Sequence, residues 1–161
     1  MTDNPAPAVE ELIHANCVVI GDYAALLIGP SGSGKSDLSL RLIDRGAILV
    51  SDDYTRLHLD EATGSVIARP PETIAGRMEV RGLGILAMPY REQAPVALVV
   101  ALVAEGEPAV ERLPMAQRSH SLCGRTIPLV RLNAMEASAP IKLEYALRAS
   151  IGLYPATEMQ P

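Results

Sequence analysis

The sequence contains no phenylalanine and no tryptophan, so a hydrophobic core must be built from aliphatic side chains. Hydrophobic residues still make up 48% of the 161 residues and charged residues 20%, a balance typical of a soluble globular protein. A chain of this length can bury one apolar core without disulfides. Long apolar runs are also absent, since the longest, Pro95 to Ala104, has the length of a buried strand and not of a membrane helix.

Cysteine and positive charge are scarce as well. Cys17 and Cys123 are too few for a disulfide framework and lack the paired spacing of metal ligands. The net charge of -5 argues against non-specific binding of nucleic acid, which needs a basic face. No basic segment precedes an apolar core within residues 1–10, which is unlike a signal peptide. We therefore expect a cytoplasmic protein with no nucleic-acid partner and no membrane association.

Apolar runs, turn residues and helical periodicity predict a single α/β domain. We expect a flexible tail over residues 1–9, the domain over 10–155 and a second tail over 156–161. The predicted strands are 17–20 and 23–28 as a hairpin, 47–50, a hairpin within 57–67, 95–103 and 127–132. Three helices are predicted: one that begins in a glycine-rich loop and runs to Arg45, a short one over 72–78, and one over 140–149.

The glycine-rich loop fits the phosphate-binding pattern G-x-x-x-x-G-K-S at every defined position. Its residues are Gly29, Pro30, Ser31, Gly32, Ser33, Gly34, Lys35 and Ser36. Glycines let successive backbone N–H groups point at phosphates, Lys35 reaches the β and γ phosphates, and the Ser36 hydroxyl binds Mg²⁺. The alternative is a glycine- and serine-rich turn that matches by chance, but an apolar strand before it and an amphipathic helix after it favour nucleotide binding.

An acidic pair, Asp52 and Asp53, follows an apolar strand 17 and 18 residues after Lys35. We expect strands 23–28 and 47–50 to be parallel neighbours that end at one edge of the sheet, which places the pair near the loop. One carboxylate would serve Mg²⁺ and the other would take a proton from an acceptor hydroxyl. A surface turn is the alternative, because aspartates are common in turns.

Other candidate residues carry weaker signals in the sequence alone. Glu79 lies among apolar residues and glycines, and a solvent-facing strand position is the favoured explanation from the residues alone. His14 precedes the first predicted strand and shares no metal-ligand spacing with the other histidines. The arginines between Arg69 and Arg131 could clamp phosphate oxygens, but spacing selects none of them.

Two segments together resemble the catalytic domain of the bacterial HPr kinase/phosphorylase family. They are the loop with its following Leu49-Val50-Ser51-Asp52-Asp53, and Glu79-Val80-Arg81-Gly82-Leu83-Gly84-Ile85, which resembles the second signature of the family. His14 and the segment Glu111-Arg112-Leu113 also match family positions, and the resemblance covers residues 12 to 150. It implies a P-loop core of the HPr kinase and phosphoenolpyruvate carboxykinase type, with a mixed sheet and flanking helices.

The resemblance further implies ATP- and Mg²⁺-dependent phosphorylation of a serine on HPr, a phosphocarrier protein, and phosphorolysis of the product. By this analogy Asp52 is the acid/base, and Ser36, Asp53 and Glu79 surround Mg²⁺. His14 and Arg112 would contact phosphoryl oxygens or hold Asp52. A hexamer is expected by the same analogy.

The sequence departs from the family in the loop before the last helix. Family members usually carry a Pro-Gly-Arg-Asn-like loop that helps phosphorolysis, whereas residues 133–140 contain no arginine here. The family also typically has a further N-terminal domain, for which this chain has no room. Two other functions stay open from the residues: a small-metabolite kinase with the same loop, and a nucleotide-sensing module without chemistry.

Overall fold

The computed structural model describes residues 9–114 and 116–153. Val9 is the one residue of the predicted tails within these ranges, since 1–8 and 156–161 lie outside them, as do residues 154–155 of the predicted domain. The strands are β1 (Glu10–His14), β2 (Asn16–Ile20), β3 (Tyr23–Ile28), β4 (Ile48–Ser51), β5 (Tyr54–Asp60), β6 (Ser65–Arg69), β7 (Arg77–Val80), β8 (Gly84–Ala87), β9 (Ala94–Leu102), β10 (Arg118–Leu122) and β11 (Arg125–Leu132). The helices are α1 (Lys35–Asp44) and α2 (Ala139–Ser150), with a 3₁₀ turn η1 (Glu72–Ile74).

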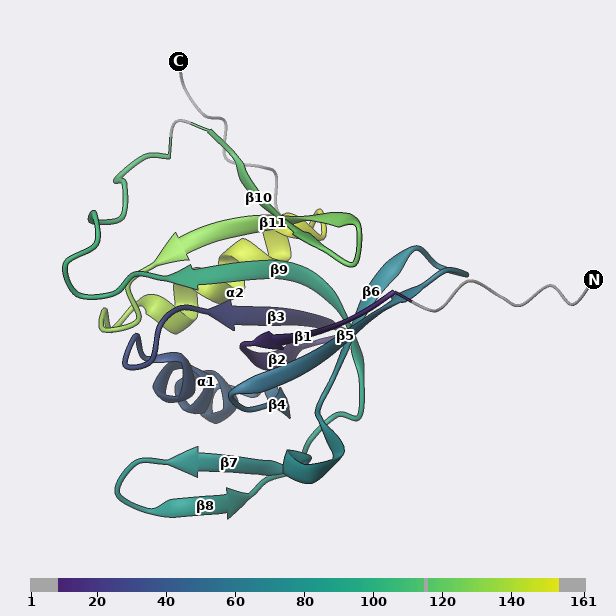
Figure 1. Cartoon of the computed structure of the whole chain (residues 1–161). Coiled ribbons are helices and arrows are strands. Elements are labelled where there is room, and N and C mark those ends of the chain that lie inside the picture. The colour runs from purple at the N-terminus through teal and green to yellow at the C-terminus, as the bar shows by residue number, and fades with distance from the viewer. Residues whose placement is uncertain (1–8, 115, 154–161) are drawn as a thin grey trace, which may run out of the picture.

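A mixed sheet of nine strands forms the body of the molecule (Figure 1). Its main path runs β1-β5-β6-β9-β3-β2-β4, and β11 adds to β9 with β10 outside it. β3, β9 and β11 are parallel, while β2 is antiparallel to both β3 and β4. The predicted fold class, a mixed sheet with flanking helices, is confirmed.

The predicted adjacency of strands 23–28 and 47–50 is wrong. β2 lies between β3 and β4, because the β2–β3 hairpin keeps its pairing and β4 adds to the free edge of β2. β2 is antiparallel to both neighbours, so β3 and β4 still run in the same direction. Their carboxyl ends therefore meet the same edge of the sheet, as the placement of the acidic pair requires.

The central strands are buried on both faces, which explains their continuous apolar sequences. In β3, Ala24 and Leu26 contribute to one core cluster, whereas Ala25 and Leu27 contribute to another. The second cluster contains the inward faces of both helices, including Leu38, Leu42, Leu143 and Leu147. The first cluster is closed by residues of β5, β6 and the β10–β11 hairpin, including Leu57, Val66, Leu122 and Ile127. Neither helix is long and apolar enough to cross a bilayer within the part of the chain described.

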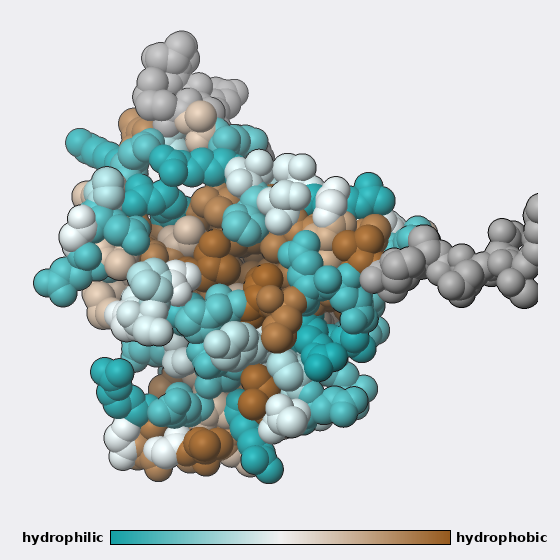
Figure 2. All heavy atoms as spheres, in the orientation of Figure 1, coloured by the Kyte–Doolittle hydropathy of each residue, from teal (hydrophilic) through white to brown (hydrophobic). Residues whose placement is uncertain are grey.

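A separate hairpin, β7–β8, packs beside α1 and β4 (Figure 1). Met78 and Val80 anchor it against Leu49. The predicted short helix over 72–78 is confirmed only over Glu72–Ile74, as the 3₁₀ turn η1, because β7 begins at Arg77. Gly76 ends that turn with φ 70, a conformation that stops a helix and sends the chain into the hairpin. Figure 2 shows hydrophobic residues at the surface of this hairpin, where Leu83 and Ile85 are exposed.

Candidate functional site

The predicted phosphate loop connects β3 to α1 and is closely packed. A methyl group added to Gly29 would lie 2.7 Å from Ser33 Oγ and 3.0 Å from the Leu102 carbonyl oxygen. Gly34 has φ 96, and a methyl group there would lie 2.9 Å from the Ala134 Cβ atom. Glycine is therefore required at both positions by backbone conformation and by space.

The Lys35 side chain folds back onto the loop that carries it. Lys35 Nζ donates hydrogen bonds to the carbonyl oxygens of Gly29 at 2.7 Å and Pro30 at 3.0 Å. Burial lowers the pKa of Lys35, and the nearby charges of Asp53 and Asp52 act in the opposite direction. A bound phosphate would supply a stronger anionic partner than these carbonyls.

Ser33 offers an independent test of whether the loop fits phosphate. Its hydroxyl is buried and has no hydrogen-bond partner among the described residues. An unsatisfied buried hydroxyl is costly unless a ligand or water pairs with it. A phosphate oxygen would satisfy it, so the residues present fit a nucleotide phosphate.

Asp52 lies at the end of β4 and accepts three hydrogen bonds. Its Oδ1 atom accepts from the Ser36 hydroxyl at 2.9 Å and from Asn16 Nδ2 at 2.8 Å. Its Oδ2 atom accepts from the Glu79 backbone N–H at 3.0 Å. Asp52 is only 8% exposed, so it is a fixed, buried carboxylate beside the hydroxyl that the motif assigns to Mg²⁺.

Asn16, the first residue of β2, is a site residue that the sequence analysis missed. Its amide Nδ2 also lies 3.3 Å from Ser36 Oγ and 3.2 Å from Ser39 Oγ, and its Oδ1 atom accepts from the Asp53 backbone N–H at 3.0 Å. It is almost fully buried. One signal could have found it, because an amide inside the apolar run Ala15–Ile20 must find hydrogen-bond partners.

Asp53 turns away from Asp52 toward His14. Its φ of 67 is left-handed, a conformation that aspartate tolerates better than most residues. Its Oδ1 atom lies 2.7 Å from His14 Nε2, with side-chain exposures of 60% for Asp53 and 39% for His14. The Tyr54 ring lies beside the imidazole, with centroids 5.2 Å apart. Of the two roles expected for His14, the hydrogen bond to Asp52 is not formed, because His14 contacts Asp53. Contact with phosphoryl oxygens stays a prediction.

The two remaining predicted residues are placed differently. Glu79 reaches the site through its backbone N–H, while its side chain is exposed on β7. Arg112 is exposed in the long segment between β9 and β10. Among the described residues, no hydrogen bond or ion pair joins Arg112 to another predicted site residue.

No preformed metal cage is visible, since the described residues contain no group of three or more His, Cys, Asp or Glu side chains that could hold a metal ion. Mg²⁺ is usually bound by one or two side chains together with substrate phosphates and waters. Ser36 and Asp52, which lie within hydrogen-bond distance of each other, could provide such a partial set of ligands.

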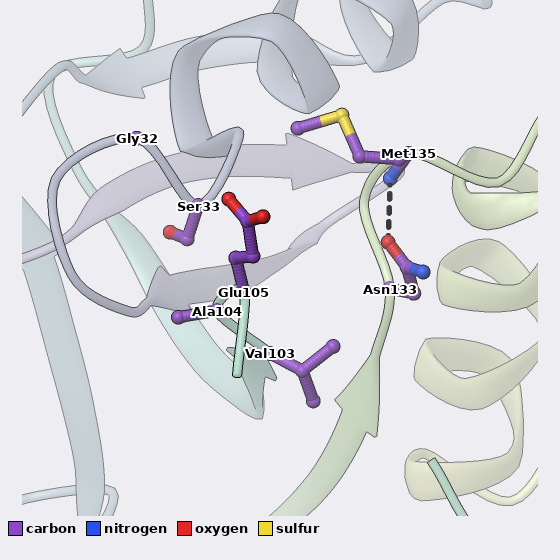
Figure 3. Close-up of a pocket in the computed structure, with 7 residues that line it drawn as sticks. All are labelled: Gly32, Ser33, Val103, Ala104, Glu105, Asn133 and Met135. Carbon is purple, nitrogen blue, oxygen red and sulfur yellow. Dashed lines mark hydrogen bonds between the residues drawn. The ribbon is translucent and has the colours of Figure 1, made fainter. Parts of the chain in front are cut away.

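A cavity of about 320 Å³ opens beside the phosphate loop (Figure 3). It is lined by Gly32, Ser33, Val103, Ala104, Glu105, Asn133 and Met135. The cavity and the acidic pair both lie at the edge of the sheet where β3 ends. The mixed sheet with flanking helices and the G-x-x-x-x-G-K-S loop at this edge are consistent with the P-loop class of proteins.

Comparison with known proteins gives the family. The family described as HPr Serine kinase C-terminal domain matches residues 6–147. HPr kinase/phosphorylase from Cupriavidus necator is 35% identical over 150 residues, which cover 86% of this chain and 45% of that protein. The corresponding protein from Chlorobium chlorochromatii is 33% identical over 133 residues, covering 78% of this chain and 40% of that protein. The chain belongs to the family of the HPr serine kinase C-terminal domain.

A solved structure agrees with this membership. The Hpr(Ser) kinase/phosphatase from Coxiella burnetii superposes with a TM-score of 0.74 at 29% identity, covering 86% of this chain and 88% of that chain. The chain spans less than half the length of the two curated relatives described above.

Proposed function

We propose that the chain is an ATP- and Mg²⁺-dependent kinase that phosphorylates a serine of HPr. The observation that carries this proposal is the pair of aspartates at the end of β4, one fixed at Ser36 and the other exposed with His14. The names of the relatives support HPr as the acceptor. An exposed carboxylate suits a protein acceptor, whose serine must approach from solvent.

The phosphates of ATP would lie on residues 29–36, where backbone N–H groups, Lys35 and the Ser33 hydroxyl can pair with their oxygens. Ser36 and Asp52 would hold Mg²⁺, with Glu79 as a further candidate ligand beside them. When bound, Mg²⁺ neutralises charge on the β and γ phosphates.

The geometry supports a division of the aspartate roles opposite to the one expected from the sequence. Both oxygens of Asp52 are occupied, and the side chain is buried. Asp53 is exposed, and His14 orients it through a single contact. We assign proton transfer to Asp53: the serine oxygen attacks the γ phosphorus, the bond to the bridging oxygen of ADP breaks, and the serine proton passes to the Asp53 carboxylate.

The first prediction is that labelled γ-phosphate moves from Mg·ATP to one serine of purified HPr. Asp53→Asn should lower the rate by about 10²–10⁴-fold, because the proton acceptor is lost, while ATP binding stays intact. Asp52→Asn should instead raise the Mg²⁺ concentration needed for half-maximal rate. The matched control is Asp22→Asn, an exposed aspartate in the turn between β2 and β3.

Three results would contradict parts of this proposal. Label on a small metabolite but not on HPr would make the protein a different kinase. ATP binding without any transfer would make it a nucleotide-sensing module. Full activity of Asp53→Asn together with loss in Asp52→Asn would return proton transfer to Asp52.

Family analogy extends the proposal to the assembly and to the reverse reaction. We propose a homo-oligomer, a hexamer by analogy, in the cytoplasm, and analytical ultracentrifugation tests its size. In phosphorolysis of phosphoserine-HPr, an oxygen of inorganic phosphate attacks the phosphoserine phosphorus and the bond to the serine oxygen breaks. The serine oxygen takes up a proton, and pyrophosphate is the product. The kinase direction is the better supported one, because residues 133–140 contain no arginine.

A further inference from the structure

The cavity beside the phosphate loop lies on the opposite side of β3 from the acidic pair. β3 has β2 as one neighbour and β9 as the other. The acidic pair follows β4, beyond β2. The cavity is walled by residues that follow β9 and β11, namely Val103 to Glu105 and Asn133 to Met135. The loop between them separates an acceptor side from a donor side.

This arrangement predicts how the phosphoryl donor is oriented, with one end at the acidic pair and the other at the cavity. In phosphoryl transfer the attacking and leaving oxygens are roughly in line with the γ phosphorus. The γ phosphate must face Asp53 and its acceptor serine. The β phosphate and everything attached to it must then extend away from the acidic pair, toward the cavity at Gly32 and Ser33.

The chemistry of the cavity does not suit further phosphate. Its seven lining residues include no lysine, arginine or histidine, and one carboxylate, Glu105. Figure 3 shows the Glu105 carboxylate directed at the space between the loop and Met135. A carboxylate repels an anion but accepts hydrogen bonds from a pair of hydroxyls, as an acidic residue does with the ribose in dinucleotide-binding folds. Val103, Ala104 and Met135 add apolar surface on which a flat base can pack.

The wall formed by residues 133–136 is held in place by the helix that follows the phosphate loop. Arg41 of α1 donates hydrogen bonds to the backbone carbonyl oxygens of Ala134 and Glu136. Asn133 Oδ1 accepts from the Met135 backbone N–H at 2.9 Å, which fixes the turn (Figure 3). The cavity wall and the loop therefore form one unit before any ligand binds.

We infer that this cavity is the nucleoside subsite of the donor, that Glu105 binds the ribose hydroxyls, and that its charge selects ATP over pyrophosphate as phosphoryl donor. This inference rests on the proposed kinase function, since it names the donor-specificity residue of the same site. In this arrangement the nucleoside binds in the cavity, and the acceptor serine binds beside the acidic pair.

Calorimetric binding to the full chain with Mg²⁺ tests the inference without requiring turnover. The probes are ATP, 2′,3′-dideoxy-ATP, which lacks both ribose hydroxyls, and pyrophosphate. Wild type should bind ATP about tenfold more tightly than the dideoxy analogue, the value of one or two hydrogen bonds to a charged group. Glu105→Ala should bind the two nucleotides equally and should bind pyrophosphate more tightly than wild type does.

Glu107→Ala is the matched control, because Glu107 is an exposed carboxylate two residues away that does not line the cavity. It should keep the wild-type preference for ATP over the dideoxy analogue. Equal binding of both nucleotides by wild type, or an unchanged preference in Glu105→Ala, would overturn the inference while leaving the kinase proposal intact. Absence of ATP binding by wild type would overturn both, and intact ribose dependence without label on HPr would overturn the acceptor alone.

Discussion

Asp52 and Asp53 are neighbours in sequence, but the backbone gives them different environments. Asp52 ends β4 with its side chain buried among donors, while the left-handed φ of 67 at Asp53 turns the next side chain out to His14. Asn16 supports both, because its amide donates to Asp52 and its carbonyl oxygen accepts from the Asp53 backbone. One buried amide thus couples the two carboxylates.

Substitution of Asn16 is the second prediction. Asn16→Ala leaves buried polar atoms of Asp52 and Asp53 without their partner and should lower the free energy of unfolding by about 1–3 kcal/mol. Asn16→Asp should be worse at pH 7, because it places a second buried carboxylate where a donor stood 2.8 Å from Asp52 Oδ1. Urea unfolding of the three proteins measures the order, and Asn16→Asp as stable as wild type at pH 7 would contradict it.

At the residue scale, the sequence predicted that the loop and the acidic pair lie close together, but not which atoms they contact. The phosphate-loop pattern fixes the spacing of Lys35 and Ser36, so their neighbourhood could be expected. The partner of His14 could not, because it depends on the register that places His14 opposite Tyr54 on β5. Asn16 was missed because a single buried amide carries no spacing pattern.

At the element scale, the phosphate loop is confined by the turn after β11. Gly34 and Gly32 both have positive φ, 96 and 83, but only Gly34 has neighbours within reach of an added methyl group. The third prediction compares alanine at these two positions. Gly34→Ala should weaken ATP binding by more than tenfold, because about 1–2 kcal/mol of left-handed strain adds to a clash with Ala134.

Gly32→Ala is the matched control for Gly34→Ala, since it has the strain without the clash. It should weaken ATP binding less, and calorimetry of both variants gives the comparison. Equal losses would show that backbone strain alone decides the effect and that the Ala134 contact is unimportant.

The two helices are joined by one bidentate ion pair. Arg45 Nε and Nη2 donate to the two carboxylate oxygens of Glu144 at 2.8 and 2.9 Å. The hydrogen bond from Arg45 lowers the pKa of Glu144 below 4.5, although its burial acts in the opposite direction. A carboxyl group whose pKa is lower in the folded than in the unfolded state stabilises the folded protein at pH values above its unfolded-state pKa. That stabilisation is lost as the pH falls through its folded-state pKa.

The fourth prediction follows from the lowered pKa of Glu144. Glu144→Gln should lower Tm by about 3 °C at pH 7, a modest effect because Arg45 is partly exposed. The difference from wild type should shrink as the pH falls below the ordinary pKa of a glutamate, because the wild-type carboxylate then becomes protonated. Thermal unfolding at several pH values measures this, and a difference that stays constant at every acidic pH at which both proteins still fold would contradict it.

Elements with a clear apolar period were predicted, and edge elements were not. β2, β3, α1, β4, β9 and α2 match apolar patterns of the right period. β1 and β10 were missed because both lie at sheet edges and alternate charged or polar residues with only a few apolar ones. Their pairing is decided by β5 and β11, far along the chain, which local patterns do not reveal.

At the scale of the whole molecule, parallel β3, β9 and β11 bring their following segments to one edge of the sheet. β4 ends at the same edge because β2 is antiparallel to both of its neighbours. The topology thus gathers the phosphate loop, the acidic pair and the cavity wall from four separate parts of the chain. Sequence patterns predicted the strands of this arrangement, but the order of the strands came only from the structure.

We expect the charges at the same edge to favour one direction of the proposed reaction. Phosphorolysis requires inorganic phosphate to be held beside the β phosphate position before it attacks phosphoserine. A cationic side chain would stabilise that anion, yet residues 133–138 contain none and direct Met135 at the loop. Glu105 adds negative charge on the same side.

The fifth prediction is that phosphorolysis is slow and can be increased by one charge. With phosphoserine-HPr and inorganic phosphate, wild type should release pyrophosphate at least about tenfold more slowly than Met135→Arg, because one favourable charge contact is worth about 1.4 kcal/mol or more. Met135→Leu is the control for size, and its rate should equal that of wild type. Pyrophosphate release by wild type as fast as its kinase reaction would show that a cation outside residues 133–138 binds the phosphate, with Arg112 the first residue to replace.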